Sequence, residues 1–389
     1  MSEPTPDRTC EPEAKSYEIW IYSPYIRARN PFLIIRTGVY AKGCAATVAV
    51  RKWFQLPARD APPNSAIYPE TRLASRKRHT TSPSNFEVRE KSVRNAFPPT
   101  ESEYVAVNGA RMHYLHAGTG RPMLLVHGLV GSTANWRNSM GPLSEIASVY
   151  AIDQLNMGQS QRVANLDAGL EATADRLSAA MDALNLAQAD IVGHSHGGAV
   201  ALMFAAHHPQ RVRSLILFAP ANPWSYPANR LVRIFSTRLG RFVARVGPYL
   251  PRRLQQGALD RMFGDPARVP AGSLQAYIQG LRIPGTMPHI LNIVRGWFAN
   301  MAKLEVALPS VAEIPTLLLW GTRDFAVDPA SAEPLQRVLR NSELHIIPGG
   351  GHILFEEFPA ISNGLMLEWL HRDLALPPHA VATEFVSKG

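Results

Sequence analysis

The feature that most constrains this chain is a regular alternation of short apolar runs with helical patterns, which begins near Glu101. Eight runs predict strands: Tyr104–Val107, Met112–His116, Met123–Val126, Val149–Ile152, Asp190–Val192, Ser214–Phe218, Thr316–Leu319 and Leu344–Ile347. Five segments between them predict helices: Asn135–Ile146, Ala172–Leu184, Ala199–His207, Ser331–Leu339 and Ile361–Leu370. A hairpin followed by repeated strand–helix units predicts an α/β domain with a doubly wound, mostly parallel eight-stranded sheet covered on both faces.

The alternation is interrupted once, between the strand that ends near Ala219 and the one that begins at Thr316. The inserted segment is rich in arginine and aromatic residues, and its pattern predicts helices. Loops at the carboxyl ends of parallel strands carry the site of such a sheet, so an insertion there covers it. We therefore expect a core of residues 101–221 and 305–376, a helical cap of residues 222–304, and a C-terminal tail of residues 377–389.

Residues 1–100 differ from the rest of the chain. Prolines are scattered through them, and 16 Lys and Arg stand against 9 Asp and Glu. One apolar patch, Phe32 to Ile35, has no periodic continuation. Too little apolar surface is available to offset the entropy of ordering, so we expect a basic, proline-containing extension that is flexible or poorly ordered. A basic anchoring arm is the alternative.

The charge of the chain is divided unequally, which bears on its partners. The net charge is +9, but the cap segment 222–304 holds 12 basic and 2 acidic residues, and the part outside the cap and the N-terminal extension is acidic. A nucleic-acid-binding function does not follow from such a distribution.

Compartment and cofactors are less constrained. No apolar stretch approaches the roughly 20 residues that span a bilayer, and Met1–Lys15 does not resemble a secretory signal. Only Cys10 and Cys44 occur, which favours a reducing, cytoplasmic compartment. No metal or organic cofactor is expected.

The most informative motif is Gly193-His194-Ser195-His196-Gly197, which follows a predicted strand and precedes a predicted helix. This G-x-S-x-G pattern places a serine on a sharp, strained turn, with glycines where a side chain would collide with the adjoining strand and helix. Ser195 is thus the expected nucleophile. His194 and His196 could instead be zinc ligands, but no further ligand follows at a suitable spacing, so packing beside the serine is the favoured interpretation.

A serine needs a base to take its proton, and the base needs an orienting carboxylate. His352 follows the last predicted strand after three glycines, and Asp324 follows Trp320-Gly321 at the end of the preceding strand. The order Ser, Asp, His suits the motif. Asp328 competes with Asp324, although its position before Pro329 favours a helix-capping role. The backbone N–H groups of Leu129 and His196 are the expected oxyanion donors.

Together these segments resemble the α/β-hydrolase family. The resemblance rests on His127-Gly128, Asp153 through Gly158-Gln159-Ser160, Gly193–Gly198, Gly321–Asp324 and Gly351-His352, and it extends from about residue 102 to residue 374. It implies a serine hydrolase with a cap inserted after the sixth strand. Epoxide hydrolases and haloalkane dehalogenases use an aspartate where Ser195 stands. Carbon–carbon bond hydrolases usually have tryptophan where Ile353 follows the histidine, and prolyl aminopeptidases carry a different elbow. A small-molecule or lipid ester hydrolase remains.

The cap, together with His127 of the core, supplies two further expectations. His127, Trp224, Met287, Trp297 and Phe298 are candidate residues of the substrate pocket, although such residues also pack small helical caps. Arginines from Arg230 to Arg245 interleave with apolar residues at helical spacing. Either the apolar stripe packs on the core while the arginines remain solvated, or the helix meets an anionic membrane surface.

The sequence therefore predicts a carboxylic ester hydrolase with an acyl–serine intermediate. Three alternatives stay open: a carbon–carbon or amide bond hydrolase on the same triad, a ligand-binding receptor on the hydrolase scaffold, and an anionic-lipid-binding protein. The oligomeric state is left open.

Overall fold

The computed structural model describes residues 15–22, 32–42, 45–50, 99–225 and 232–374. The chain divides into two units, Met1–Ser92 and Val93–Gly389, which are described separately. The first contains three strands, β1 (Lys15–Tyr22), β2 (Phe32–Lys42) and β3 (Ala45–Val50), paired antiparallel in that order.

The sequence analysis did not predict these three strands. The missed signals are the β-branched and aromatic residues of Lys15–Tyr22 and the two-residue separation of β2 from β3, with glycine as the first of the two. The apolar patch Phe32 to Ile35 lies at the start of β2. Apart from the three strands, residues 1–98 lie outside the described residues, as do residues 377–389.

The second unit is built on an eight-stranded sheet. Its strands are β4 (Glu101–Val107), β5 (Ala110–Ala117), β6 (Arg121–Val126), β7 (Ala147–Ile152), β8 (Ala189–His194), β9 (Val212–Phe218), β10 (Thr316–Gly321) and β11 (Ser342–Ile347), in the order β11-β10-β9-β8-β6-β7-β5-β4. The pairs β4–β5 and β5–β7 are antiparallel and all others are parallel. Each of the eight predicted strands is present, and the prediction of a doubly wound, mostly parallel sheet is confirmed.

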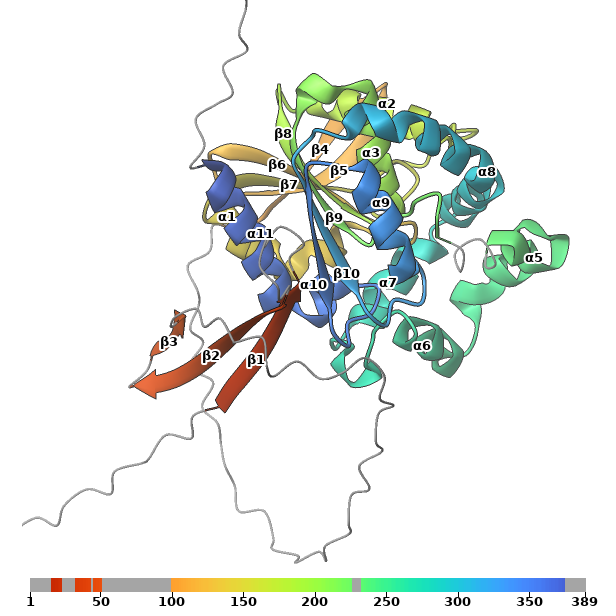
Figure 1. Cartoon of the computed structure of the whole chain (residues 1–389). Coiled ribbons are helices and arrows are strands. Elements are labelled where there is room, and N and C mark those ends of the chain that lie inside the picture. The colour runs from red at the N-terminus through yellow and green to blue at the C-terminus, as the bar shows by residue number, and fades with distance from the viewer. Residues whose placement is uncertain (1–14, 23–31, 43–44, 51–98, 226–231, 375–389) are drawn as a thin grey trace, which may run out of the picture. The chain divides into compact units, whose positions relative to one another are not determined.

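Both faces of this sheet are buried, because alternate residues of each central strand enter different cores. Leu124, Leu217 and Leu318 belong to one core, and Leu125, Ile216 and Leu319 belong to the other. The first core includes α2 (Leu170–Ala183), α3 (His196–His207) and α9 (Ala332–Val338); the second includes α1 (Met140–Ser144), α10 (Leu354–Glu357) and α11 (Pro359–Leu374). Figure 1 shows α1 and α11 on one side of the sheet and α3 and α9 on the other.

The insertion between β9 and β10 is helical, as expected for a cap. Residues 232–236 are helical and are followed by α5 (Arg238–Val246), α6 (Arg252–Asp260), α7 (Ser273–Arg282) and α8 (Thr286–Ala307). The expected boundary after residue 304 falls inside α8, which packs Ile293, Trp297 and Leu304 against the first core. Within the described residues no helix is long and apolar enough to cross a membrane.

Candidate active site

Ser195 occupies the turn between β8 and α3 in strained backbone geometry. Its φ of 54° and ψ of −121° lie outside the backbone regions that residues other than glycine ordinarily adopt. The turn is fixed by main-chain hydrogen bonds: Ser195 N–H donates to Phe218 O at 3.0 Å, and Ala221 N–H donates to Ser195 O at 2.9 Å. The strain therefore persists because residues at and just after the end of β9 bind both the N–H and the carbonyl group of Ser195.

The glycines around Ser195 are required by close backbone approach. A Cβ on Gly197 would lie 2.4 Å from the carbonyl oxygens of Val126 and His127, and one on Gly193 would lie 2.7 Å from Gly198 Cα. Gly198 in turn faces Pro220, at 2.6 Å. Contacts below about 3 Å with backbone atoms cannot be relieved by a side-chain movement, so the steric reason expected from the sequence holds at these positions.

The structure brings His352 and Asp324 together. His352 Nδ1 lies 2.8 Å from Asp324 Oδ2, and both side chains are buried. The second carboxylate oxygen, Oδ1, accepts the N–H groups of Ala326 and Val327 at 2.8 and 2.9 Å, which fixes the orientation of the carboxylate. A carboxylate on Nδ1 holds the proton there and leaves Nε2 free to act as a base.

Asp328, the competing acid, serves the neighbouring helical turn. Its carboxylate accepts the N–H of Ala330 at 3.0 Å and caps the 3₁₀ helix Pro329–Ser331. Of the two acids that the sequence left open, the structure thus places Asp324 on the histidine.

The His352 main chain is held from the core and from the cap. His194 Nε2 donates to His352 O at 3.1 Å, and His352 N–H donates to Met262 O at 2.7 Å. Burial, followed by the proximity of His352, holds the pKa of His194 well below 6.5, so this imidazole stays neutral. Its role in the structure is to fix the position of the His352 loop.

The loop after β6 passes beside the serine. A Cβ on Gly128 would lie 3.2 Å from Ser195 Cβ, and the N–H groups of Leu129 and His196 donate to no group in the described part of the chain. Buried His127 fixes this loop: its Nδ1 lies 2.8 Å from Gly128 O, and its Nε2 accepts the N–H of Gln154 at 3.1 Å. Burial lowers the pKa of His127, which keeps the ring neutral.

Ser195 and His352 open on the same cavity, of about 550 Å³. Its wall combines core loops with cap residues and is largely apolar, with contributions from Val232, Leu259, Leu274, Ile278 and Val294. A volume in this range accommodates a small organic or acyl ligand.

Of the five residues expected in the pocket, the structure places Trp297 on the cavity wall. His127, Trp224, Met287 and Phe298 are not among the lining residues. Trp224 and Met287 pack against the first core, while Phe298, next to Trp297 on α8, points to another side of the helix and is 42% exposed beneath Arg233. The sequence signal that was missed is the spacing of Leu274, Tyr277 and Ile278 on α7, which turns one helix face toward the cavity.

Comparisons with known proteins agree with this fold. The family model described as alpha/beta hydrolase fold matches residues 121–359, more than half of the chain. The chain belongs to this family.

Among its relatives, an uncharacterized protein of Mycobacterium tuberculosis is 28% identical over 292 residues, covering 69% of this chain and 80% of the relative. The 2-hydroxymuconate semialdehyde hydrolase of a Pseudomonas species is 38% identical over 127 residues, covering 32% of this chain and 44% of the relative. A solved structure of a membrane phospholipase A has a TM-score of 0.61 and 25% identity, covering 71% of this chain and 87% of that one.

A hydrogen-bonded polar cluster lies on the largely apolar cavity wall of this alpha/beta hydrolase. Tyr277 O–H donates to Glu356 Oε1 at 2.8 Å, and Asn135 Nδ2 donates to the same oxygen at 2.8 Å and also contacts Tyr277 Oη. Arg137 donates to the other carboxylate oxygen at 2.6 Å. Burial and Glu356 raise the pKa of Tyr277 well above 10, so the phenol remains protonated. The cluster joins α7 to the core at the cavity wall.

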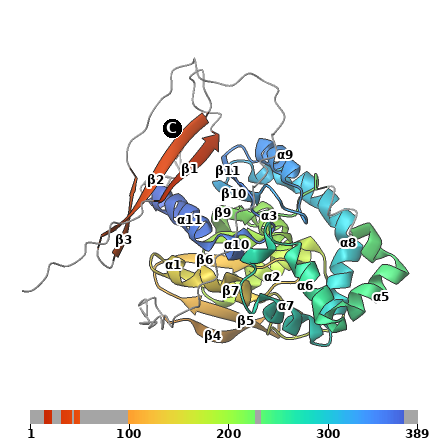
Figure 2. The ribbon, with the colours of Figure 1, turned by 90° about the horizontal axis from the view of Figure 1, so that it is seen from below.

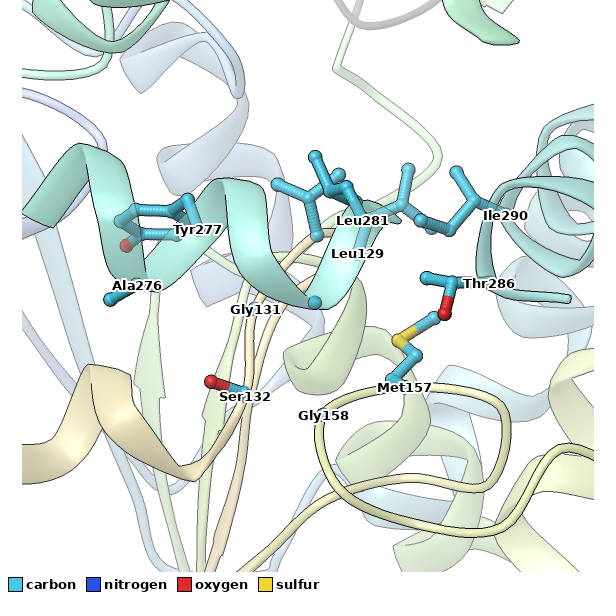
Figure 3. A pocket seen from close by; sticks show the side chains of 12 residues that line it. Leu129, Gly131, Ser132, Met157, Gly158, Ala276, Tyr277, Leu281, Thr286 and Ile290 are labelled. Carbon is cyan, nitrogen blue, oxygen red and sulfur yellow. The ribbon is translucent and has the colours of Figure 1, made fainter. Parts of the chain in front are cut away.

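A second hollow lies behind Tyr277, between α7, the start of α8 and the core loops. Figure 3 shows Tyr277 and Leu281 of α7 facing the loop that carries Gly131 and Ser132, with Met157 and Thr286 beyond them. Its volume of about 10 Å³ suits at most one water molecule, so we regard it as the seam between cap and core.

Buried Glu357 joins the cap of the hydrolase to the His352 loop. Oε2 accepts the N–H groups of Gly351 and Gly264 at 2.7 and 3.0 Å, while Oε1 accepts Asp265 N–H at 3.1 Å and Arg268 at 3.0 Å. Sequence reasoning missed this residue. The available signal was an adjacent pair of carboxylates, Glu356 and Glu357, directly after the apolar run Ile353–Phe355.

No metal site accompanies these groups in the part of the chain that the structure describes, where no three His, Cys, Asp or Glu side chains are placed to bind an ion. His196, one of the two histidines considered as a zinc ligand, has a buried ring whose nitrogens contact no described polar group.

Proposed function

We propose that this hydrolase cleaves carboxylic esters with an apolar acyl chain through an acyl–serine intermediate. The observation that carries the proposal is the strained Ser195 on the wall of a large apolar cavity that also contains His352, whose Nδ1 is bound by Asp324. A nucleophile, a base with a fixed tautomer and an acyl-sized space are the parts that ester hydrolysis requires.

In this mechanism Ser195 Oγ attacks the ester carbonyl while His352 Nε2 takes its proton. Asp324 keeps His352 in the reactive orientation and stabilises the imidazolium that forms. The amides of Leu129 and His196 bind the oxyanion, and loss of one such donor typically costs about 3 kcal/mol of transition-state stabilisation. The imidazolium then protonates the departing alkoxide, and water activated by the same histidine releases the acid.

Two observations support an acyl chain rather than a polar substrate. The cavity wall is mainly aliphatic and aromatic, and it includes Leu259, Ile278 and Trp297 of the cap. The similar solved structure named above is described as a membrane phospholipase A. We therefore favour a lipid-like ester over a short, polar one.

Carbon–carbon bond hydrolysis on the same triad is the second candidate. The identity of 38% to a 2-hydroxymuconate semialdehyde hydrolase favours it, although that similarity covers only 32% of this chain. Amide hydrolysis and ligand sensing use the same residues. Only the rate of turnover of esters and amides distinguishes these two functions from ester hydrolysis.

The test combines active-site labelling with a substrate series. The full-length protein, Ser195→Ala and His352→Ala are treated with a fluorophosphonate probe and assayed with p-nitrophenyl esters of increasing chain length. We expect labelling to be lost in both variants and kcat to fall by about 10⁴ or more in Ser195→Ala, with kcat/KM of the parent rising toward longer acyl chains. Ser310→Ala, an exposed serine of the cap–core junction, is the matched control.

Labelling without multiple turnover of any ester would contradict the proposal and favour a receptor. Cleavage of a ring-fission dienoate in preference to all esters would favour the carbon–carbon hydrolase.

A further inference from the structure

The outer part of the cap exposes large apolar side chains together with arginines. We call this set the basic apolar face. Its exposed apolar members are Ile234, Leu239, Phe242, Val243, Tyr249, Leu250 and Leu254, and its exposed arginines are Arg233, Arg238, Arg245, Arg252 and Arg253. The exposed fractions of Leu239, Tyr249 and Phe242 are 72%, 67% and 62%. Such a concentration of exposed apolar side chains marks an interaction surface in a folded protein.

Helix α5 shows why these side chains remain outside the core. Leu239, Phe242 and Val243 share one stripe of the helix, whereas the buried position is Gly240. Gly240 lies against the backbone of Ile234, where a Cβ would be 2.0 Å from the carbonyl oxygen. The helix therefore packs through its glycine, and its apolar stripe does not pack on the core as the first interpretation of the sequence expected.

The charge of this face is of one sign. Residues 222–259 contain seven arginines and no Asp or Glu. Among the described residues, Arg233, Arg238 and Arg245 form no ion pair with a carboxylate, in contrast to Arg337 and Arg340 on the core. Their charge is available to an anionic partner.

We propose that the basic apolar face docks on an anionic membrane surface. A helix with Leu and Phe on one stripe and arginines beside it lies in the interface of a bilayer, with its apolar stripe among the acyl chains and its guanidinium groups at the phosphates. A symmetric contact with a second copy of the chain would instead bring arginines against arginines, which is unfavourable.

The location of the face fits this role. Figures 1 and 2, at right angles, both show α5 at the outer edge of the cap, away from the sheet. The next helix, α6, carries Arg252, Arg253 and Leu254 on the surface and lines the cavity with Gln255, Ala258 and Leu259. Because Ala258 and Arg261 line the cavity and are also exposed, the cavity meets solvent beside this face. A membrane bound there lies next to the opening of the cavity.

Docking does not depend on the reaction at Ser195, so it is measured in full-length protein carrying Ser195→Ala. Co-sedimentation compares vesicles of phosphatidylcholine with vesicles in which half of the lipid is phosphatidylglycerol, at low and high sodium chloride. We expect binding to the anionic vesicles only, weakened by salt. Arg238→Glu with Arg245→Glu lowers the partition coefficient by about 25-fold or more, since each arginine near an anionic surface contributes roughly fivefold.

The apolar contribution is tested with Leu239→Asp plus Phe242→Asp, which we expect to abolish sedimentation. Ile361→Asp on α11 and Arg337→Glu on α9 are matched controls, because these residues are also exposed but lie on the core. All four variants change exposed side chains, and thermal melts verify that they fold as the parent does.

Equal binding to both kinds of vesicle would overturn the proposal. So would unchanged binding of the α5 variants, which would assign the membrane contact to another part of the chain. A parent that sediments as a dimer in solution, and α5 variants that sediment as monomers, would identify the face as a contact between two copies.

Discussion

The buried ring of His196 makes the stability of this protein depend on pH in a direction that the structure fixes. Both ring nitrogens lack a described partner, and burial, followed by the nearby His289 and His127, lowers the pKa of His196 from 6.5 to about 3. In the unfolded chain the imidazole titrates near 6.5. Between these values the unfolded state binds one more proton than the native state, so the free energy of unfolding falls as the pH falls.

The magnitude follows from the size of this window. Each pH unit below about 6.5 costs roughly 1.4 kcal/mol for one such group, which gives about 2 kcal/mol at about pH 5 relative to neutral pH. His196→Leu removes the proton-binding group, fills a similar volume and eliminates two unsatisfied nitrogens. We therefore expect the variant to be at least as stable as the parent at neutral pH, and its advantage to increase by about 2 kcal/mol by about pH 5.

Urea denaturation followed by circular dichroism at several pH values measures this difference. His371→Leu, at an exposed position of α11, is the matched control for loss of a histidine. Ester hydrolysis by His196→Leu is expected to stay within a few-fold of the parent, because the proposed oxyanion donor at this position is the backbone N–H. If the stability difference between variant and parent does not change with pH, the imidazole is not desolvated and the reasoning fails.

Two further outcomes are expected. Asp324→Asn lowers kcat by about 10³- to 10⁴-fold because the amide no longer fixes the reactive tautomer of His352. The control, Asp328→Asn, preserves a capping side chain and leaves kcat near that of the parent. Equal losses of kcat in the two variants would refute the assignment of the acid. Glu357→Gln sets an amide N–H₂ either against the N–H groups of Gly351 and Gly264 or against those of Asp265 and Arg268. We expect it to lower the free energy of unfolding by about 2 to 3 kcal/mol, measured by urea titration with exposed Glu333→Gln as control. An unchanged midpoint would show that this junction does not contribute.

Much of the core was predictable because its signals are local. Each of the eight strands is a short apolar run, and the turn at Ser195 is encoded by glycines within three residues of it. Asp324 and His352 were predictable because each lies in the loop after a strand whose end must lie at one edge of a parallel sheet.

What escaped prediction depends on the meeting of distant segments. Tyr277 reaches Glu356 across 79 positions, and Glu357 binds Gly264 across 93. The periodicity of the sequence does not predict such a contact, because the contact depends on how the cap is oriented on the core. For the same reason the residues of the cavity wall were assigned mainly from their large apolar side chains, and four of the five do not line it.

The His352 loop is attached to the cap at Met262, Gly264 and Asp265. The cap sequence before residue 262 can therefore vary more freely than the sequence from residue 262 onward. Chimeras that exchange residues 222–304 between relatives replace the wall of the cavity together with the acceptor that holds the histidine main chain. An exchange that stops before residue 262 replaces the first cap helices and leaves that anchor in place. Divergence of substrate range within such proteins can therefore proceed through the outer segment while the inner one is retained.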